Sequence, residues 1–195
     1  VKVGLKRRED AGHYSGDEEF NYFLAVAFPD EDLYIMDYNR LVKDLNGYTT
    51  EQFLTELRKN FSVEESAGQY KPKEKHTCGM YLEGKWYQLT AKPGTFDSDN
   101  VIERLDVSIL QNNLLGPILG IQDPRTDKRI DFAGGIRGLE ELEKRADQDM
   151  KVAFAMYPTT IEGLISVADS GMIMPPKSTW FEPKLRSGLF VHRFF

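Results

Sequence analysis

The 195-residue sequence has one cysteine, Cys78, and only three histidines, which are scattered along the chain. A single cysteine excludes an internal disulfide framework, and no cysteine or histidine spacing is typical of a metal site. No run of about 18 apolar residues is present, so no membrane span is expected. The N-terminal VKVGLKRRED has cations without a following apolar stretch, so no signal peptide is expected either. These absences favour a reduced cytoplasmic protein, with Cys78 as a thiol in a half-buried strand.

Acidic residues outnumber basic ones, with 31 aspartates and glutamates against 25 lysines and arginines. The formal net charge is −6 and the isoelectric point is about 5.2, which argues against strong binding of nucleic acid. Hydrophobic residues make up 41% and aromatic residues 12% of the chain, as in a globular protein. We predict that residues 1–195 form a single compact domain. Because the first residue is not methionine and the chain opens inside what could be a helix, we expect a fragment of a longer protein.

Several apolar runs predict strands. Phe20–Phe28 and Lys151–Tyr157 are continuous runs, typical of strands buried on both faces. We expect the first run to pair with Leu33–Tyr38 in a hairpin. A second hairpin is predicted from His76–Leu82 and Lys85–Ala91, which are joined by the two-residue turn Glu83-Gly84. Short strands are predicted at Arg129–Asp131 and Gly188–Phe194. The expected core residues include Phe23, Ala25, Ala27, Phe154 and Met156.

Helices alternate with these strands. A capping box of Thr49 and Gln52 predicts a helix with Phe53, Leu54, Leu57 and Phe61 on its apolar face. Further helices are predicted over about Asp106–Leu115 and about Gly138–Asp147. Thr159 and Glu162 predict another capping box, before a helix with the apolar face Ile161, Leu164, Ile165 and Ala168. The pattern favours an α+β domain with a mixed or largely antiparallel sheet flanked by helices.

The stretch MPPKSTWFEPKLRSGLF, Met174–Phe190, is the most distinctive part of the chain. Residues 172–195 carry a net charge of +3, which leaves −9 for the rest. One interpretation is that this basic segment simply pairs with acids on the acidic body. The other is that it gathers charge around a bound phosphate or carboxylate. On the second interpretation we predict an ordered, extended Met174–Gly188, with an anion-binding site made of Arg40, Lys177, Ser178, Thr179 and Lys184.

This stretch nearly matches a phosphate-binding P-loop. In the sequence Gly171 to Ser178, however, Pro176 replaces the second glycine of the G-x-x-x-x-G-K-[ST] pattern. Proline has no N–H to offer a phosphate, and Pro183 leaves little room for the helix that must follow. A P-loop is therefore excluded.

Three other features leave their alternatives open. Asp37 to Arg40 places an acid, an amide and a base at a strand end, which fits either a polar site or a strand-terminating turn. Ala133-Gly134-Gly135 is either a flexible turn or a place where backbone approaches a ligand closely. Trp180 is a core residue or the cover of a small ligand.

Four segments in this order resemble one protein family: HYSGDEEFNYFLAVAFPDEDLYIMDYNRLVKDLNG, LDVSILQNNLLGPILGI, FAMYPTTIEGLISVAD and MPPKSTWFEPKLRSGLF. They are similar to the bacterial and archaeal domain of unknown function family number 1015, over nearly the whole chain. The family brings no established activity with it.

Members of this family look longer at the N-terminus, where a DGHHR-type motif resembles that of ParB-like proteins. Some ParB-like proteins are similar to free-serine kinases that use a nucleotide. The resemblance therefore implies the C-terminal part of a phosphotransferase-like enzyme that acts on a small anionic metabolite, with free serine as one candidate. No cofactor is expected in this fragment, whereas a nucleotide and Mg²⁺ fit the longer protein. The alternative is a non-enzymatic ParB-like module for binding or self-association, such as a homodimer. No catalytic residue is carried over by this resemblance.

Overall fold

The computed structural model describes residues 2–13, 15–27, 29–184 and 186–193. The chain divides into two units, one formed by Val1–Tyr34 with Pro183–Phe195 and the other by Ile35–Glu182. The expectation that residues 1–195 fold as one domain stays a prediction.

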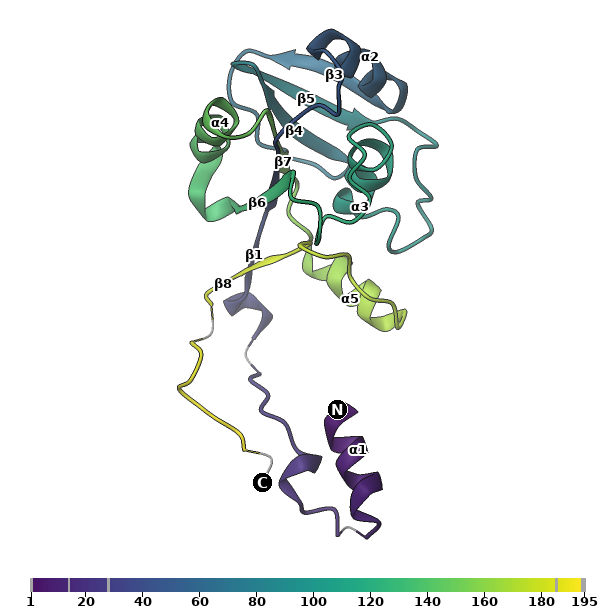
Figure 1. Ribbon diagram of the computed structural model, residues 1–195, viewed down its shortest axis with the longest axis vertical. Helices are drawn as coiled ribbons and strands as arrows, with labels where there is room; N and C mark the ends of the chain where they lie inside the picture. Colours follow the sequence, from purple (N-terminus) through teal and green to yellow (C-terminus); the bar gives the residue numbers. More distant parts are fainter. Residues whose placement is uncertain (1, 14, 28, 185, 194–195) are drawn as a thin grey trace. The chain divides into compact units, whose positions relative to one another are not determined.

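A six-stranded sheet is the centre of the unit formed by residues 35–182 (Figure 1). Its order is β3-β5-β4-β7-β2-β6, and every neighbouring pair is antiparallel. This confirms the α+β class and the largely antiparallel sheet predicted from sequence. The strands are β2 (Tyr38–Val42), β3 (Phe61–Ser66), β4 (Thr77–Leu82), β5 (Lys85–Ala91), β6 (Ile130–Gly134) and β7 (Val152–Met156). A separate two-stranded sheet joins β1 (Tyr34–Met36) to β8 (Trp180–Glu182).

Helices lie on both faces of the six-stranded sheet. On one face, Leu142 of α4 packs with Leu41, Tyr81 and Ala153. The other face carries the larger core, where Phe154 packs among residues of the remaining helices. These helices are α2 (Thr50–Asn60), α3 (Asp106–Leu110) with its π-helical continuation Gln111–Leu115, and α5 (Ile161–Asp169), while α4 spans Gly138–Gln148. A short 3-10 turn, Gly135–Arg137, precedes α4.

Local sequence signals account for the best-predicted elements. The Thr49 hydroxyl accepts a hydrogen bond from the Gln52 N–H, and the Gln52 side chain accepts one from the Thr49 N–H, so the capping box starts α2 as predicted. The β4–β5 hairpin turns at Glu83 and Gly84, which both have positive φ, as a two-residue hairpin turn requires. The strand that contains Cys78 was expected to be half-buried, but every residue of β4 is buried, including Cys78.

The predicted buried strand Phe20–Phe28 is wrong. Residues 19–21 form a 3-10 turn and residues 22–27 have no strand structure, while Phe28 lies outside the described residues. Phe23 is 72% exposed, and Ala25 and Ala27 are exposed as well, whereas Phe154 and Met156 are buried as expected. An apolar run becomes a buried strand only where neighbouring strands pair with it, and no described segment does so here. The unit formed by Val1–Tyr34 with Pro183–Phe195 contains α1 (Lys2–Ala11), the turn Glu19–Asn21 and the turn Asp30–Asp32.

Two further strand predictions fail for the same reason. β1 pairs with β8 and not with the run that precedes it, so the first predicted hairpin does not exist. No strand occurs within residues 188–193, and Phe194 lies outside the described residues. Of the distinctive C-terminal stretch, residues 174–182 belong to the sheet-containing unit and end in the extended β8.

Candidate functional site

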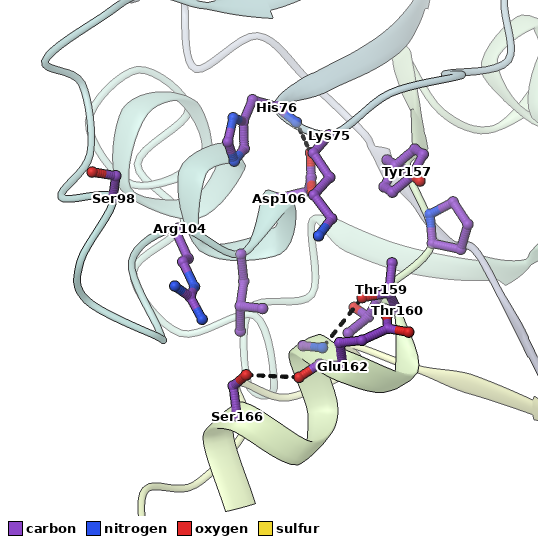
Figure 2. A pocket seen from close by; sticks show the side chains of 13 residues that line it. Lys75, His76, Ser98, Arg104, Asp106, Tyr157, Thr159, Thr160, Glu162 and Ser166 are labelled. Atoms are coloured by element: carbon purple, nitrogen blue, oxygen red, sulfur yellow. Dashed lines mark hydrogen bonds between the residues drawn. The ribbon is translucent and has the colours of Figure 1, made fainter. Parts of the chain in front are cut away.

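A cavity of about 330 Å³ opens at one end of the six-stranded sheet (Figure 2). It is bounded by the residues before β4, by the start of α3 and by the loop between β7 and the first turns of α5. A pocket with a few convergent polar groups is the usual form of a small-molecule site. The lining residues are Lys75, His76, Ser98, Arg104, Leu105, Asp106, Tyr157, Pro158, Thr159, Thr160, Glu162, Gly163 and Ser166.

Asp106 is the first residue of α3 and lies at the wall of this pocket. Its carboxylate accepts a hydrogen bond of 2.6 Å from the backbone N–H of His76. Burial raises the pKa of Asp106 to about 7, although the backbone N–H groups of His76 and Asp106 and the charge of Lys75 oppose the shift. The carboxyl group therefore exchanges a proton near neutral pH, as a general acid or base must.

His76 is held in an unusual backbone conformation, with φ of 64°. Its imidazole packs on Phe96, with 4.5 Å between ring centroids. Burial, followed by the charge of Lys75, lowers the pKa of His76, so the ring is neutral at pH 7. The imidazole is thus a neutral wall of the pocket, while the backbone N–H of the same residue orients Asp106.

Lys75 and Arg104 supply positive charge to the pocket. Figure 2 shows the Lys75 side chain extending between Asp106 and the first turn of α5. Neither cation forms a salt bridge with any carboxylate in the described ranges. The charge of Lys75 acts on Asp106 and Glu162 without direct contact, so the ammonium group is available to a ligand that carries negative charge.

The N-terminus of α5 forms the opposite wall. The hydroxyl of Thr160 accepts a hydrogen bond of 3.2 Å from the Gly163 N–H, so the N-cap is Thr160 and not Thr159, which corrects the predicted capping box. The pKa of Glu162 is lowered by its own backbone N–H and by the Thr160 hydroxyl. Because the Glu162 carboxylate already interacts with the N–H groups of this helix end, the binding of an anion would depend on the positive charges of Lys75 and Arg104. Along α5 the buried residue is Val167, while Ile165 and Ala168 are exposed, contrary to prediction.

The residues predicted as an anion site lie elsewhere, and the structure brings three of them together. Arg40 in β2 donates a hydrogen bond of 3.0 Å to the backbone carbonyl of Lys177. The Lys177 ammonium group lies 3.3 Å from the Tyr38 hydroxyl and 5.4 Å from the centre of the Tyr38 ring. Ser178 is buried, and its hydroxyl donates to the Pro175 carbonyl at 2.6 Å.

The other two predicted residues are not brought into this group. Thr179 is half-buried, next to Ser178 in the chain. Lys184 belongs to the unit formed by Val1–Tyr34 and Pro183–Phe195, so its convergence with Arg40 stays a prediction. The anion site as a whole is likewise still a prediction.

In the polar cluster at the start of β2, Asp37 and Asn39 are held by contacts within the protein. Asp37 is 4% exposed, binds the Asn39 amide at 2.6 Å and pairs with Lys71 at 3.4 Å. A Cβ atom added to Gly135 would lie 2.2 Å from the Asp37 carboxylate, and one added to Gly134 would lie 2.6 Å from the Trp180 ring. The two glycines therefore allow the side chains of Asp37 and Trp180 to pack closely against the backbone.

Sequence reasoning missed the group formed by Lys75, Arg104 and Asp106. Asp106 was expected only as the start of a helix, and no motif marks the two cations. The sequence does show Asp106 at a helix start, two residues after Arg104. Only the fold of the sheet brings this segment next to Lys75 and Thr160. Among residues with described positions, no three His, Cys, Asp or Glu side chains are grouped so that they could hold a metal ion. The described helices include none long and apolar enough to cross a bilayer.

The fold and site define an α+β protein with an antiparallel sheet and a polar, ligand-sized pocket at its end. Residues 1–108 match the model of the family described as "Protein of unknown function (DUF1015)". The match covers more than half of the chain, and the chain belongs to this family. This confirms the resemblance found in the sequence, whereas the ParB-like relationship and the C-terminal placement stay predictions. None of the curated proteins compared with the chain matches it significantly.

Several solved structures resemble the chain at low sequence identity. A free serine kinase in complex with AMP has a TM-score of 0.46 and 14% identity, covering 77% of this chain and 54% of its own. The same kinase as a mutant in complex with ADP gives 0.45 and 16%, covering 77% and 54%. A conserved hypothetical protein from Pyrococcus furiosus gives 0.45 and 16%, covering 78% and 57%. The chain thus spans about half the length of these proteins, and the likeness is too distant to carry their functions over.

Proposed function

We propose that the chain is part of a phosphotransferase-like enzyme, and that the pocket of Lys75, Arg104 and Asp106 binds a small anionic metabolite. The observation that carries this proposal is the Asp106 carboxyl group, whose pKa of about 7 is combined with two cations, Lys75 and Arg104, that form no salt bridge among the described residues. Charged phosphoryl groups require cations, and the attacking hydroxyl requires a base, so the pocket holds residues of both kinds.

In this proposal each residue has a separate task. Lys75 and Arg104 bind the negative charge of the phosphate or carboxylate. Asp106 accepts the proton of the substrate hydroxyl, and the His76 N–H keeps its carboxylate in place through the 2.6 Å hydrogen bond. The hydroxyl groups of Thr159, Thr160 and Ser166 offer further polar contacts at the α5 side of the pocket.

The two cations fit the phosphate groups of a nucleotide, which would supply the phosphoryl group when bound. A divalent cation has no ready set of ligands in the described part of the chain, since no group of three suitable side chains occurs. No step is therefore assigned to a metal.

Free serine is one substrate to test within this proposal. It carries a hydroxyl group for Asp106 and a carboxylate for a cation, so its chemistry suits the pocket as well as that of other small hydroxy acids. Homoserine and glycerate are the matched alternatives, because they differ in length or lack the amino group.

The test is a phosphorylation assay on the full-length protein that contains this chain. ATP and ADP are offered as donors with serine, homoserine and glycerate, and product is followed by ³¹P NMR. We expect turnover with at least one substrate, and a loss of about 10²–10⁴-fold in Asp106→Asn. The matched control Asp97→Asn changes an exposed aspartate in the loop after β5 and is expected to leave turnover unchanged. Absence of turnover throughout the panel would contradict the proposal.

A second candidate function is self-association without catalysis, and one observation favours it. The side chains of Tyr22, Phe23, Leu24 and Val26 are all more than half exposed. Contiguous exposed apolar side chains are typical of protein interfaces. Sedimentation of the wild type and of Phe23→Asp would distinguish a concentration-dependent dimer, lost in the variant, from a monomer in both.

A further inference from the structure

Arg40 is a buried cation without an acidic partner. It is 4% exposed, and its two hydrogen bonds go to the backbone carbonyls of Tyr38 and Lys177. No described carboxylate lies within salt-bridge distance of it. Burial lowers the pKa of Arg40 to about 10, so the guanidinium is still charged at neutral pH. A buried charge is costly unless it is paired, and such a group calls for an explanation.

A second cavity, of about 480 Å³, lies next to this guanidinium. It is separate from the pocket in Figure 2, since the two share no lining residue. Its walls come from β6, from α3 with its π-helical continuation, from the loop after it and from the start of the distinctive C-terminal stretch. The apolar lining residues are Val107, Leu115, Pro124, Phe132, Ile173, Met174, Pro175 and Pro176.

Among the described charged residues that line this cavity, Arg40 is the one that is not paired with an opposite charge. Arg125 and Asp123 also line the cavity, but they bind each other through two hydrogen bonds of 2.9 Å. The side-chain amides of Gln111 and Gln122 donate to the backbone carbonyls of Ile121 and Gly116. Their amide orientation is therefore fixed, with the carbonyl oxygen of each left as a hydrogen-bond acceptor.

The segment after α5 holds the guanidinium in position. Arg40 binds the Lys177 carbonyl, and the Ser178 hydroxyl closes the same turn on the Pro175 carbonyl. Lys177 has a φ of 58°, a left-handed conformation that a lysine rarely adopts. The hydrogen bonds of Arg40 and Ser178 stabilise the turn in this conformation. The Arg40 guanidinium also lies 5.7 Å from the centre of the Phe132 ring, which forms the neighbouring wall.

We propose that this cavity binds a small organic monocarboxylate with an apolar body, its carboxylate on Arg40 and its hydrocarbon part against Phe132, Leu115 and Met174. A planar guanidinium matches a carboxylate through two parallel hydrogen bonds. One uncompensated cation beside Asp123 suits a monoanion better than a phosphate dianion. Eight of the thirteen lining residues are apolar, which favours a ligand with an apolar part. The site is independent of the pocket around Asp106, and either proposal can fail alone.

The test uses methyl-detected NMR and thermal shift on the full chain, with hexanoate and benzoate as probes. Hexanamide and benzamide are the matched neutral controls, and inorganic phosphate tests for a general anion effect. We expect saturable shifts of the Met174 and Leu115 methyl signals with the carboxylates, a melting temperature that rises with their concentration, and no response to the amides.

Two variants complete the design. Arg40→Lys removes the planar guanidinium, and Gln122→Glu adds a carboxylate to the lining while it leaves Arg40 in place, so the test does not depend on the fold of one variant. Each is expected to weaken binding at least about tenfold. The proposal is overturned if the carboxylates cause no saturable shift in the wild type, if the amides or phosphate act as strongly, or if Gln122→Glu binds like the wild type.

Discussion

The backbone N–H of His76 donates a 2.6 Å hydrogen bond to the carboxylate of Asp106, thirty positions later in the chain. His76 precedes β4 and Asp106 begins α3, so this bond joins the sheet to the helix that forms the pocket wall. It also places a carboxyl group with a pKa of about 7 beside Lys75. The relationship leads directly to a pH-dependent prediction.

Asp106→Asn should stabilise the protein above pH 7. The folded-state pKa of about 7 exceeds the ordinary aspartate pKa of 3.8, so the folded state holds the proton more tightly. The stabilising effect of protonated Asp106 is complete below about pH 4 and is lost as the pH rises through 7. We expect a gain of about 1–3 kcal/mol at pH 8 and little change at pH 4, measured by urea unfolding. An equal effect at both pH values would contradict the shift.

Asp123→Asn is the matched control for that experiment. The side-chain hydrogen bond from Arg125 lowers the pKa of Asp123, so its contribution is present above the unfolded pKa and is lost as the pH falls. The control should therefore show the opposite sign of pH dependence. Because Asp123 is accessible to solvent, we expect the effect to be small.

Phe154→Ala should destabilise the protein by about 3–5 kcal/mol, because it removes a fully buried ring from the larger core. The matched control is Phe23→Ala, since Phe23 is exposed and its truncation leaves no cavity. Urea unfolding of both variants is the measurement. A loss below about 1 kcal/mol for Phe154→Ala would show that the core has been placed wrongly.

Gly135→Ala should be destabilising by about 1–3 kcal/mol, since its Cβ would lie 2.2 Å from a carboxylate oxygen of the buried Asp37. Asp37 cannot move away freely, because it binds the Asn39 amide. Gly68→Ala is the control, as nothing lies within 4 Å of the added atom. Equal melting temperatures for the two variants would mean that Asp37 is not held as described.

The anion site predicted around Lys177 has its own test. Phosphate, ATP and phosphoserine are titrated into wild type and Lys177→Ala at matched ionic strength, followed by thermal shift. A site predicts stabilisation that grows with ligand, to about 2.7 kcal/mol at 99% occupancy, and disappears in the variant. If both proteins respond alike, Lys177 serves only to attach the segment through Tyr38 and the ring of Phe132.

Sequence predicted the fold wherever the signal was local. A capping box starts α2, two residues with positive φ turn the β4–β5 hairpin, and a continuous apolar run forms β7. The run Phe20–Phe28 is equally apolar, but no described strand pairs with it. The composition of a segment does not reveal whether another strand will pair with it. β3 was missed because FSVEES is a largely polar edge strand.

The same difference between local and long-range signals applies to the candidate sites. The unusual composition of the C-terminal stretch led to Arg40 and Lys177, which do lie together. Lys75 and Asp106 could not be found from sequence, because their proximity depends on a positive φ at His76 and on the packing of α3 against the sheet.

The most direct test of the proposed function is a ³¹P NMR titration of phosphoserine with the wild type, Lys75→Ala, Arg104→Ala and the control Lys59→Ala. Lys59 is an exposed lysine on α2 that pairs with Glu56. We predict saturable binding to wild type and control, weakened about tenfold or more in each of the other two variants, because each loses a charge-assisted contact to the phosphate. Binding that is absent from the wild type, or equal in all four proteins, would contradict the assignment of this pocket.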